Sequence, residues 1–500
     1  MAAVTAYIGA RININFQDLY PDQVKKLKRD NVIRIYEEKA CKGCDYLSIR
    51  PSEYCSPCPA MQKFVMHGKL RLGDDDYLTL PVGYKDELEE IIPNIKFVYK
   101  TKLTPFKHNI TFNWDVLRPL QKKAVKALMQ KERGILRAPP RSGKTILASA
   151  TSIYLGYKTF IIASQHDWLQ GFYKALMGEN GEPSIFVNAP EGSIGFAKKL
   201  ADFKKYDICL ITYQTLMHND KLLQQVKNMG TTVIIDEVQF AAGTEYAKVI
   251  GSLSARYMFG LSGTPFRKDG KEVLFNKLIN KIVHKVNTET LTPTFVVVQS
   301  PFSSKPVKSS RWDLIVKRIE DDDDRAEFIA QHAIRDAQRG HTVLIPMSSI
   351  SGIDKVTNAI NRLMGKRVAV KFTGNQSKAE RDAIVTRASA GKIRIIVGTL
   401  RLLSVGINIP RASMLYEVAL SSNVYNAEQR IARVLTPMEG KPTPTVKVFM
   451  DDYDVRRACF SNEWFHYTLP KCKPIISEKA LQYLTAWMKS KTSSSRSLYE

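Results

Sequence analysis

Two short segments of the chain combine residue types that can bind and cleave a phosphoanhydride. The first is a loop between an expected strand at residues 134–136 and an expected helix, and it reads Ala138, Pro139, Pro140, Arg141, Ser142, Gly143, Lys144 and Thr145. Backbone N–H groups of such a loop point at phosphate oxygens, and the following helix presents its positive end to them. We therefore expect Lys144 to hold the β and γ phosphates of a nucleotide and Thr145 to bind Mg²⁺. Ala138 stands where the usual pattern has its first glycine, so a chance Gly-Lys-Thr is the alternative for this loop taken alone.

The second segment is an acidic pair at the end of an apolar run. Residues 231–235 (TTVII) are rich in β-branched side chains and predict a buried strand that ends in Asp236 and Glu237. Ligands of open α/β folds bind at the carboxyl edge of the sheet, where these two carboxylates would lie. We expect Asp236 to anchor Mg²⁺ from its second coordination shell and Glu237 to orient and deprotonate the attacking water. A strand that runs directly into both acids makes a solvated surface pair the weaker interpretation.

These segments belong to a regular alternation of short β-rich runs and longer helix-like stretches, which predicts parallel sheets covered by helices. The expected strands fall into two series, at residues 134–136, 159–163, 208–212, 232–235 and 257–261, and then at 342–345, 368–372, 393–397, 414–418 and 445–450. Two α/β blocks are the simplest account of this pattern. The expected break between them is the basic, Ser-rich segment 302–311.

The acidic run at residues 320–324 (EDDDD) has two interpretations. It precedes a helix-like stretch at 325–339, and acidic side chains in a first turn favour the positive end of a helix. We interpret it as a helix start, with metal binding as the minor alternative.

Segments in both blocks resemble, in order, the motifs of superfamily 2 helicases. The resembling segments are 117–121 (LRPLQ), 161–170, 211–216, 236–239 (DEVQ) and 260–270 in the first block, then 342–349, 398–410 and 429–433 (QRIAR) in the second. The resemblance implies two tandem RecA-like domains, of α/β fold, that bind ATP and Mg²⁺ in the cleft between them.

The resemblance also implies roles for individual residues. Gln121 would read the adenine edge with Arg118 beside it, Gln239 would belong to the catalytic set, and Gly406 and Asn408 would contribute to nucleotide binding from the second domain. Asn408 replaces the Asp of many relatives. The residues that would contact the nucleic acid backbone are Gln165, His166, Thr212, Tyr213, Ser348 and Thr399.

The last motif departs from the family pattern QRxGRxxR. Ala432 replaces the glycine, and Thr436 replaces the final arginine. A cation must offset the charge that develops on the γ phosphoryl group during hydrolysis. Arg433 is therefore the leading arginine finger and Arg430 the second choice.

Four of the seven cysteines form one cluster near the start of the chain, namely Cys41, Cys44, Cys55 and Cys58. Two CxxC turns at this spacing can surround one tetrahedral Zn²⁺, with an iron–sulfur cluster or uncoordinated thiols as the alternatives.

The expected domains are an accessory zinc-containing domain at 1–108, a first RecA-like domain at 109–300, a second at 310–455 and an extension at 456–500 that ends in a disordered tail.

The net charge of +25 is unevenly distributed, because +20 of it lies between residues 111 and 450. Such an excess suits a surface that follows a polyanion such as DNA, although scattered solubilising charge is the alternative.

No apolar run is long enough to span a membrane, and the start lacks a secretory signal. We therefore expect a cytoplasmic protein, in the host cytoplasm if a phage encodes it.

As a whole, the layout is similar to UvsW-like branch-migration helicases of lytic phages. This resemblance implies an ATP-dependent DNA helicase that acts on forked or Holliday-type DNA in recombination, repair or replication. The alternatives are an RNA helicase or RNA-dependent ATPase, a zinc-containing DNA-binding protein with a vestigial motor, and a restriction-type translocase subunit. The last lacks support, since no nuclease constellation is visible in the sequence.

Overall fold

The computed structural model of the chain describes residues 4–36, 61–139, 142–179, 181–263, 265, 271–287, 291–303, 312–404, 407–418, 424–452 and 475–476. The chain divides into two compact units, Met1–Thr288 and Glu289–Glu500. Within the described ranges, no helix is both long and apolar enough to cross a bilayer.

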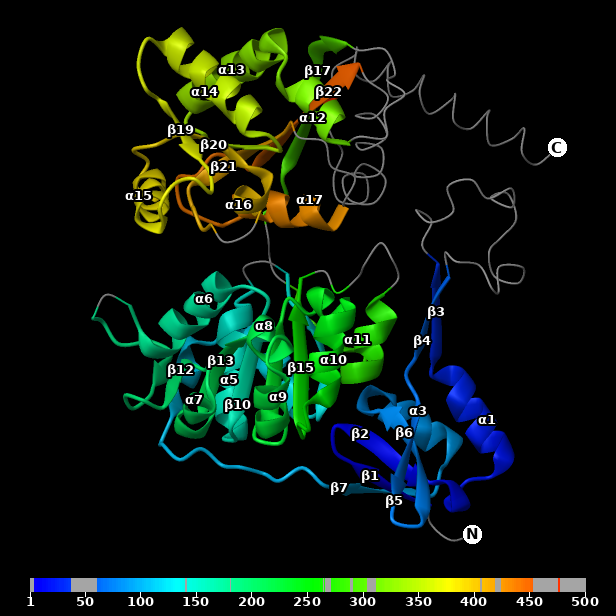
Figure 1. The fold of residues 1–500 in the computed structure, drawn as a ribbon. Helices are drawn as coiled ribbons and strands as arrows, with labels where there is room; N and C mark the ends of the chain where they lie inside the picture. The colour runs from blue at the N-terminus through cyan, green and yellow to red at the C-terminus, as the bar shows by residue number, and fades with distance from the viewer. Residues whose placement is uncertain are drawn as a thin grey trace, which may run out of the picture. The chain divides into compact units, whose positions relative to one another are not determined.

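The first unit begins with a small α/β module, drawn in blue in Figure 1. Its mixed sheet has the order β5, β6, β2, β1, β7, and a separate antiparallel ribbon pairs β3 with β4. The elements are β1 (Val4–Ile8), β2 (Arg11–Asn15), η1 (Phe16–Asp18), α1 (Pro21–Asp30), β3 (Val32–Tyr36), β4 (Met61–Val65), β5 (Gly68–Leu72), β6 (Asp75–Pro81), η3 (Val82–Tyr84), α3 (Lys85–Ile91) and β7 (Ile95–Tyr99). The ribbon leads into and out of residues 37–60, since Tyr36 pairs with Met61 at its end.

The rest of the first unit, which we call lobe 1, is a parallel sheet with helices on both faces (Figure 1). Its described strands stand in the order β12, β13, β10, β14, β15, β9, β16. Neighbouring residues of one strand, such as Ile161 and Ile162, enter the apolar cores on opposite faces. Burial on both faces explains why these strands are continuous apolar runs.

The strands of lobe 1 are β8 (Thr111–Phe112), β9 (Arg133–Arg137), β10 (Thr159–Ala163), β11 (Val187–Asn188), β12 (Ile194–Phe196), β13 (Ile208–Thr212), β14 (Thr232–Asp236), β15 (Tyr257–Ser262) and β16 (Ile282–Lys285). The helices are η4 (Trp114–Val116), α4 (Pro119–Met129), α5 (Lys144–Leu155), α6 (His166–Met177), α7 (Leu200–Lys205), α8 (Tyr213–Met217), α9 (Asp220–Val226), η5 (Val238–Ala242), α10 (Thr244–Ser252) and α11 (Glu272–Ile279).

The second unit, lobe 2, repeats this architecture with the parallel strand order β19, β20, β18, β21, β22, β17, β23. The strands are β17 (Thr294–Ser303), β18 (Thr342–Met347), β19 (Ala369–Phe372), β20 (Ile395–Thr399), β21 (Ala412–Glu417), β22 (Thr445–Asp452) and β23 (Ile475–Ile476). The helices are α12 (Trp312–Glu320), α13 (Asp323–Gln338), α14 (Ile350–Met364), α15 (Lys378–Ser389), α16 (Leu400–Ser404), α17 (Val424–Ile431) and η6 (Ala432–Val434).

All ten strands expected from the sequence are present, with ends shifted by at most two residues. The helix expected after the acidic run is also present. Asp322 caps α13 by accepting a 2.7 Å hydrogen bond from the backbone N–H of Arg325, while Asp323 and Asp324 lie in the first turn.

The expected boundary between the lobes was wrong. The chain divides between residues 288 and 289, before β17, and not near residue 300. The reason is that β17 pairs in parallel with β22 from Thr294 onward, so residues 294–303 belong to the sheet of lobe 2. This sheet also extends beyond residue 455, because β23 pairs with β17.

The amino-terminal module is fastened to lobe 1 by a polar cluster around Glu132. This carboxylate accepts hydrogen bonds from the Tyr99 hydroxyl of the module and from Arg256 of lobe 1, and the Arg256 guanidinium lies 3.2 Å from the centroid of the Tyr99 ring. The Lys85 ammonium completes the cluster, 3.6 Å from Glu132.

The module also contacts lobe 1 through backbone atoms at Gly83. A Cβ atom there would come within 2.6 Å of two backbone carbonyl oxygens of α11, so this contact requires glycine.

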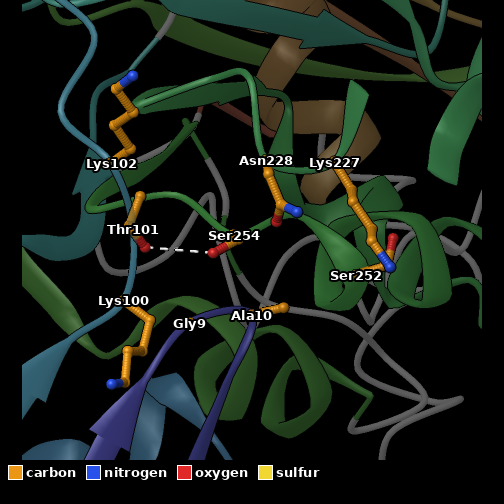
Figure 2. A pocket seen from close by; sticks show the side chains of 9 residues that line it. All are labelled: Gly9, Ala10, Lys100, Thr101, Lys102, Lys227, Asn228, Ser252 and Ser254. Atoms are coloured by element: carbon orange, nitrogen blue, oxygen red, sulfur yellow. Dashed lines mark hydrogen bonds between the residues drawn. The ribbon is translucent and has the colours of Figure 1, made fainter. Parts of the chain in front are cut away.

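A pocket of about 430 Å³ lies at the same joint (Figure 2). Thr101 and Ser254 share a 3.2 Å hydrogen bond between their hydroxyls across it. Three lysines line the pocket, but Lys100 and Lys102 point away from this bond, and Lys227 donates to Gln224. Because the three cations do not converge, we interpret the pocket as part of the joint between module and lobe.

Candidate functional site

The loop that is expected to bind phosphates (the phosphate loop) connects β9 to α5, as the sequence predicts. Gly143 caps the amino end of α5 with φ of 87°, in the left-handed region that favours glycine. The next residue, Lys144, begins the helix, so the positive end of α5 faces the loop that contains Ser142. Pro139 is described and half-buried, whereas Pro140 and Arg141 lie outside the described residues.

Gln121 ties the loop to the start of α4. Its Oε1 accepts a 2.9 Å hydrogen bond from the backbone N–H of Arg118, and its Nε2 donates a 2.9 Å hydrogen bond to the carbonyl of Ser142. A Cβ atom on Gly143 would lie 2.4 Å from this Nε2. The residue expected to read adenine is therefore buried against the phosphate loop, beside the exposed Arg118.

A continuous chain of polar contacts joins the phosphate loop to two strand ends. The Lys144 ammonium pairs with Oε1 of Glu237, and Oε2 of Glu237 accepts a 2.8 Å hydrogen bond from Gln239. Gln239 in turn accepts a 2.6 Å hydrogen bond from the Ser262 hydroxyl at the end of β15. Glu237 adopts φ of 48°, an unusual conformation for a non-glycine residue that is typical of functional sites.

Asp236 is buried at the end of β14, and burial raises the pKa of its carboxyl to about 7. The nearby Lys144 lowers this pKa, and Glu237 raises it. A divalent cation beside Asp236 would favour the ionised carboxylate. Two buried oxygen atoms at this place, Oδ1 of Asp236 and Oγ of Ser142, have no hydrogen-bond partner within the described part of the chain. The site therefore fits a Mg²⁺–nucleotide complex.

The residues expected to contact nucleic acid lie at the carboxyl ends of the strands in both lobes. In lobe 1, Gln165 follows β10 and Thr212 ends β13, at the sheet edge that also carries Lys144 and Asp236. Two of these residues stack on aromatic rings: His166 on Phe196 with centroids 4.8 Å apart, and Tyr213 on Tyr246 with centroids 4.2 Å apart. In lobe 2, Ser348 follows β18 and Thr399 ends β20.

The two arginines of the last motif have different surroundings. Arg430 is fully buried and forms two hydrogen bonds of 2.9 and 2.7 Å with the buried carboxylate of Glu417. Arg433 is half-buried and donates to the backbone carbonyls of Ser404 and Ile407, over 2.7 to 3.0 Å. Arg430 thus stabilises the packing of α17 on β21, while Arg433 lies next to segment 398–410, which resembles a helicase motif.

The structure describes only some of the other predicted site residues. Asn408 is exposed between the buried Ile407 and Ile409. Gly406 and the cysteines Cys41, Cys44, Cys55 and Cys58 lie outside the described residues. Sequence reasoning missed Glu417, because nothing in the local pattern identifies it as the partner of Arg430.

Two known families match the chain. The family described as type III restriction enzyme, res subunit, matches residues 115–267, and the helicase conserved C-terminal domain matches residues 324–436. The first match contains Lys144 and Glu237, and the second contains Arg433.

Individual proteins are also similar. The chain is 27% identical over 313 residues to the probable helicase D10 of Escherichia phage T5, over 62% of this chain and 66% of D10. It is 22% identical over 362 residues to the DNA 3'-5' translocase XPB2 of Sulfurisphaera tokodaii, over 64% of this chain and 78% of XPB2. The crystal structure of T4 UvsW aligns with 95% of this chain and 99% of that chain, with 16% identity and a TM-score of 0.39.

Proposed function

Because the chain belongs to the superfamily 2 helicases, we propose that it is an ATP-driven motor that moves on DNA. The observation that carries this proposal is the chain of contacts from Lys144 through Glu237 and Gln239 to Ser262. It connects the loop that would hold phosphates to the ends of β14 and β15, at the same sheet edge as the expected nucleic-acid contacts. Such a connection is what a nucleic-acid-dependent ATPase needs.

Each residue of lobe 1 has a distinct proposed role. Lys144 and the backbone of the loop would hold the β and γ phosphates, and Thr145 and Asp236 would hold Mg²⁺. When bound, Mg²⁺ offsets the negative charge of the phosphates. Glu237 exchanges its partner Lys144 for the attacking water, which it orients and deprotonates.

We assign the arginine finger to Arg433 in preference to Arg430. Support comes from burial, because Arg430 and Glu417 form a buried ion pair, and breaking such a pair is strongly destabilising, which gives Arg430 a structural role. Arg433 is half-buried and donates to the backbone carbonyls of Ser404 and Ile407, and its guanidinium is the cation that we propose offsets charge on the γ phosphoryl group.

DNA is the proposed polymer, and branched DNA the proposed substrate. The similarity to XPB2, whose name states a DNA translocase, supports DNA. The order of a small module and then two lobes is the layout that the sequence shares with UvsW-like branch-migration helicases, and this resemblance supports a branched substrate. An RNA helicase is the alternative, since contacts to a phosphate backbone do not by themselves distinguish the sugar.

A panel of substrates tests the proposal. ATPase stimulation, strand displacement and branch migration would be measured with single-stranded DNA, forked DNA, a Holliday-type junction and RNA. We expect forked and junction DNA to give the largest stimulation, and Lys144→Ala to abolish hydrolysis while it retains DNA binding. Lys174→Ala, which removes an exposed lysine paired with Glu179, is the matched control. Stimulation by RNA alone would overturn the DNA assignment.

We further propose that Cys41, Cys44, Cys55 and Cys58 bind one structural Zn²⁺. Support comes from their spacing and from the β3–β4 ribbon, whose paired ends at Tyr36 and Met61 bring together the two ends of the segment that contains all four cysteines. Metal analysis of the purified protein should find about one zinc per chain, and iron with acid-labile sulfide would contradict it.

A further inference from the structure

Lobe 2 contains a second cavity, of about 440 Å³, at the sheet edge opposite to the expected nucleic-acid contacts. It lies where β19 and β20 begin, whereas Ser348 and Thr399 lie where β18 and β20 end. None of the residues that line the cavity belongs to a segment that resembles a helicase motif. The cavity therefore requires a separate explanation.

Two similar turns supply the rim of the cavity. Gly365-Lys366-Arg367 precedes β19, and Gly391-Lys392-Ile393-Arg394 precedes β20, so that parallel pairing of the two strands places the turns side by side. Arg387, in the last turn of α15, adds a fifth cation, and no carboxylate lines the cavity.

The five cations of this rim differ in their ion pairing from three other cations of lobe 2. Lys355, Arg362 and Lys371 each form an ion pair, with Asp323, Glu327 and Asp354 respectively. None of the five rim cations has a carboxylate within 4.0 Å in the part of the chain that the structure describes. Mutual repulsion of five like charges is unfavourable, and an anionic partner would relieve it.

The floor of the cavity is aliphatic. Ile334 of α13, Met364 of α14, Val368 and the β19 residue Val370 line it while remaining half-exposed. No aromatic ring and no acidic side chain lines the cavity, and Gln338 is its single uncharged polar side chain. Nucleic acid bases are bound mainly by aromatic or arginine stacking and by hydrogen bonds to their edges, which this floor does not offer.

We propose that this cavity docks an acidic peptide segment of a partner protein that inserts one large apolar side chain onto the aliphatic floor. Its volume lies within the range of about 300–1,000 Å³ of ligand pockets, which accommodates such a side chain. The five cations then pair with the Asp and Glu side chains that flank the anchor. The motor thus has a docking site for a protein on lobe 2, away from its nucleotide and nucleic-acid edge.

The test uses the full-length protein and a fluorescein-labelled decapeptide of Asp and Glu residues with one leucine near its carboxyl end. Fluorescence anisotropy should show saturable binding that weakens as salt concentration rises. Replacing the leucine by serine should weaken binding at least fivefold. This comparison tests whether the aliphatic floor binds the apolar side chain, and it leaves the protein unchanged. The double variant Arg387→Glu, Arg394→Glu should weaken it at least tenfold and leave DNA-stimulated ATPase unchanged.

Arg362→Glu is the control for charge reversal, because it reverses one charge at an exposed position outside the cavity. It should bind the peptide as the wild type does, and all variants should keep the wild-type melting temperature. The proposal is overturned if the leucine and serine peptides bind equally. It is also overturned if the double variant loses affinity for labelled single-stranded DNA while peptide binding persists.

Discussion

The Ser262 hydroxyl, at the end of β15, donates a 2.6 Å hydrogen bond to Oε1 of Gln239, whose amide holds Glu237. We expect Ser262→Ala to disconnect β15 from the acidic pair while the Lys144–Glu237 contact remains. Basal ATPase should stay within about twofold of the wild type, and stimulation by DNA should fall about tenfold, near the upper limit for one net hydrogen bond.

Steady-state ATPase assays with and without forked DNA check this prediction. Ser252→Ala is the control, because its hydroxyl donates only to the Val249 carbonyl of its own helix. An equal loss of basal and stimulated hydrolysis in Ser262→Ala would assign the serine to chemistry instead of to coupling.

Much of this site follows from sequence, because its residues sit where buried strands end. The run at residues 231–235 predicts β14, and β14 places Asp236 at the carboxyl edge without further information. The contact between Gln239 and Ser262 could not be predicted, since it depends on β14 and β15 being neighbours. The domain boundary failed for the same reason: the run that forms β17 indicates a strand, but only its pairing with β22 assigns it to lobe 2.

Gly143→Ala should weaken nucleotide binding at least tenfold. The alanine would have to adopt φ of 87°, and its Cβ would collide with Nε2 of Gln121 at 2.4 Å. Titration with a fluorescent ATP analogue measures the effect. Gly73→Ala is the control for an alanine at positive φ outside the site, because Gly73 has φ of 63° and nothing lies within 4 Å of its added Cβ. Normal nucleotide affinity in Gly143→Ala would contradict the tight packing of Gln121 against the loop.

Arg430→Ala should mainly lower the stability of the protein, whereas Arg433→Ala should mainly lower its rate of ATP hydrolysis. Loss of Arg430 breaks a buried ion pair with Glu417, so we expect a destabilisation of about 3–5 kcal/mol and a lowered melting temperature. Loss of Arg433 should instead reduce kcat by about 10³-fold or more, with a smaller change in stability. Thermal melting and single-turnover ATPase on the same samples distinguish the two. Full activity in Arg433→Ala would remove it as the arginine finger.

Glu132→Ala should loosen the amino-terminal module from lobe 1. It removes the shared acceptor of Tyr99 and Arg256, so one polar group of the module and one of lobe 1 lose this acceptor together. We expect faster proteolysis between residues 100 and 110 and a melting temperature lowered by a few degrees. Glu245→Ala, which breaks an exposed pair with Lys248 on α10, is the control. Unchanged cleavage rates would show that the joint does not depend on this cluster.

His332 should make the stability of lobe 2 sensitive to acid. Burial, together with Lys447 and Arg335, lowers the pKa of its imidazole to about 4, and Asp336 opposes this shift. Since the folded pKa lies below the unfolded value of about 6.5, the stabilisation is complete above pH 6.5 and is lost as the pH falls toward 4. The ring contacts Phe328 and Phe449 edge to face, so phenylalanine can replace it. Between pH 7 and 5, the wild type should therefore lose a few degrees more of melting temperature than His332→Phe, and equal losses would contradict the assignment.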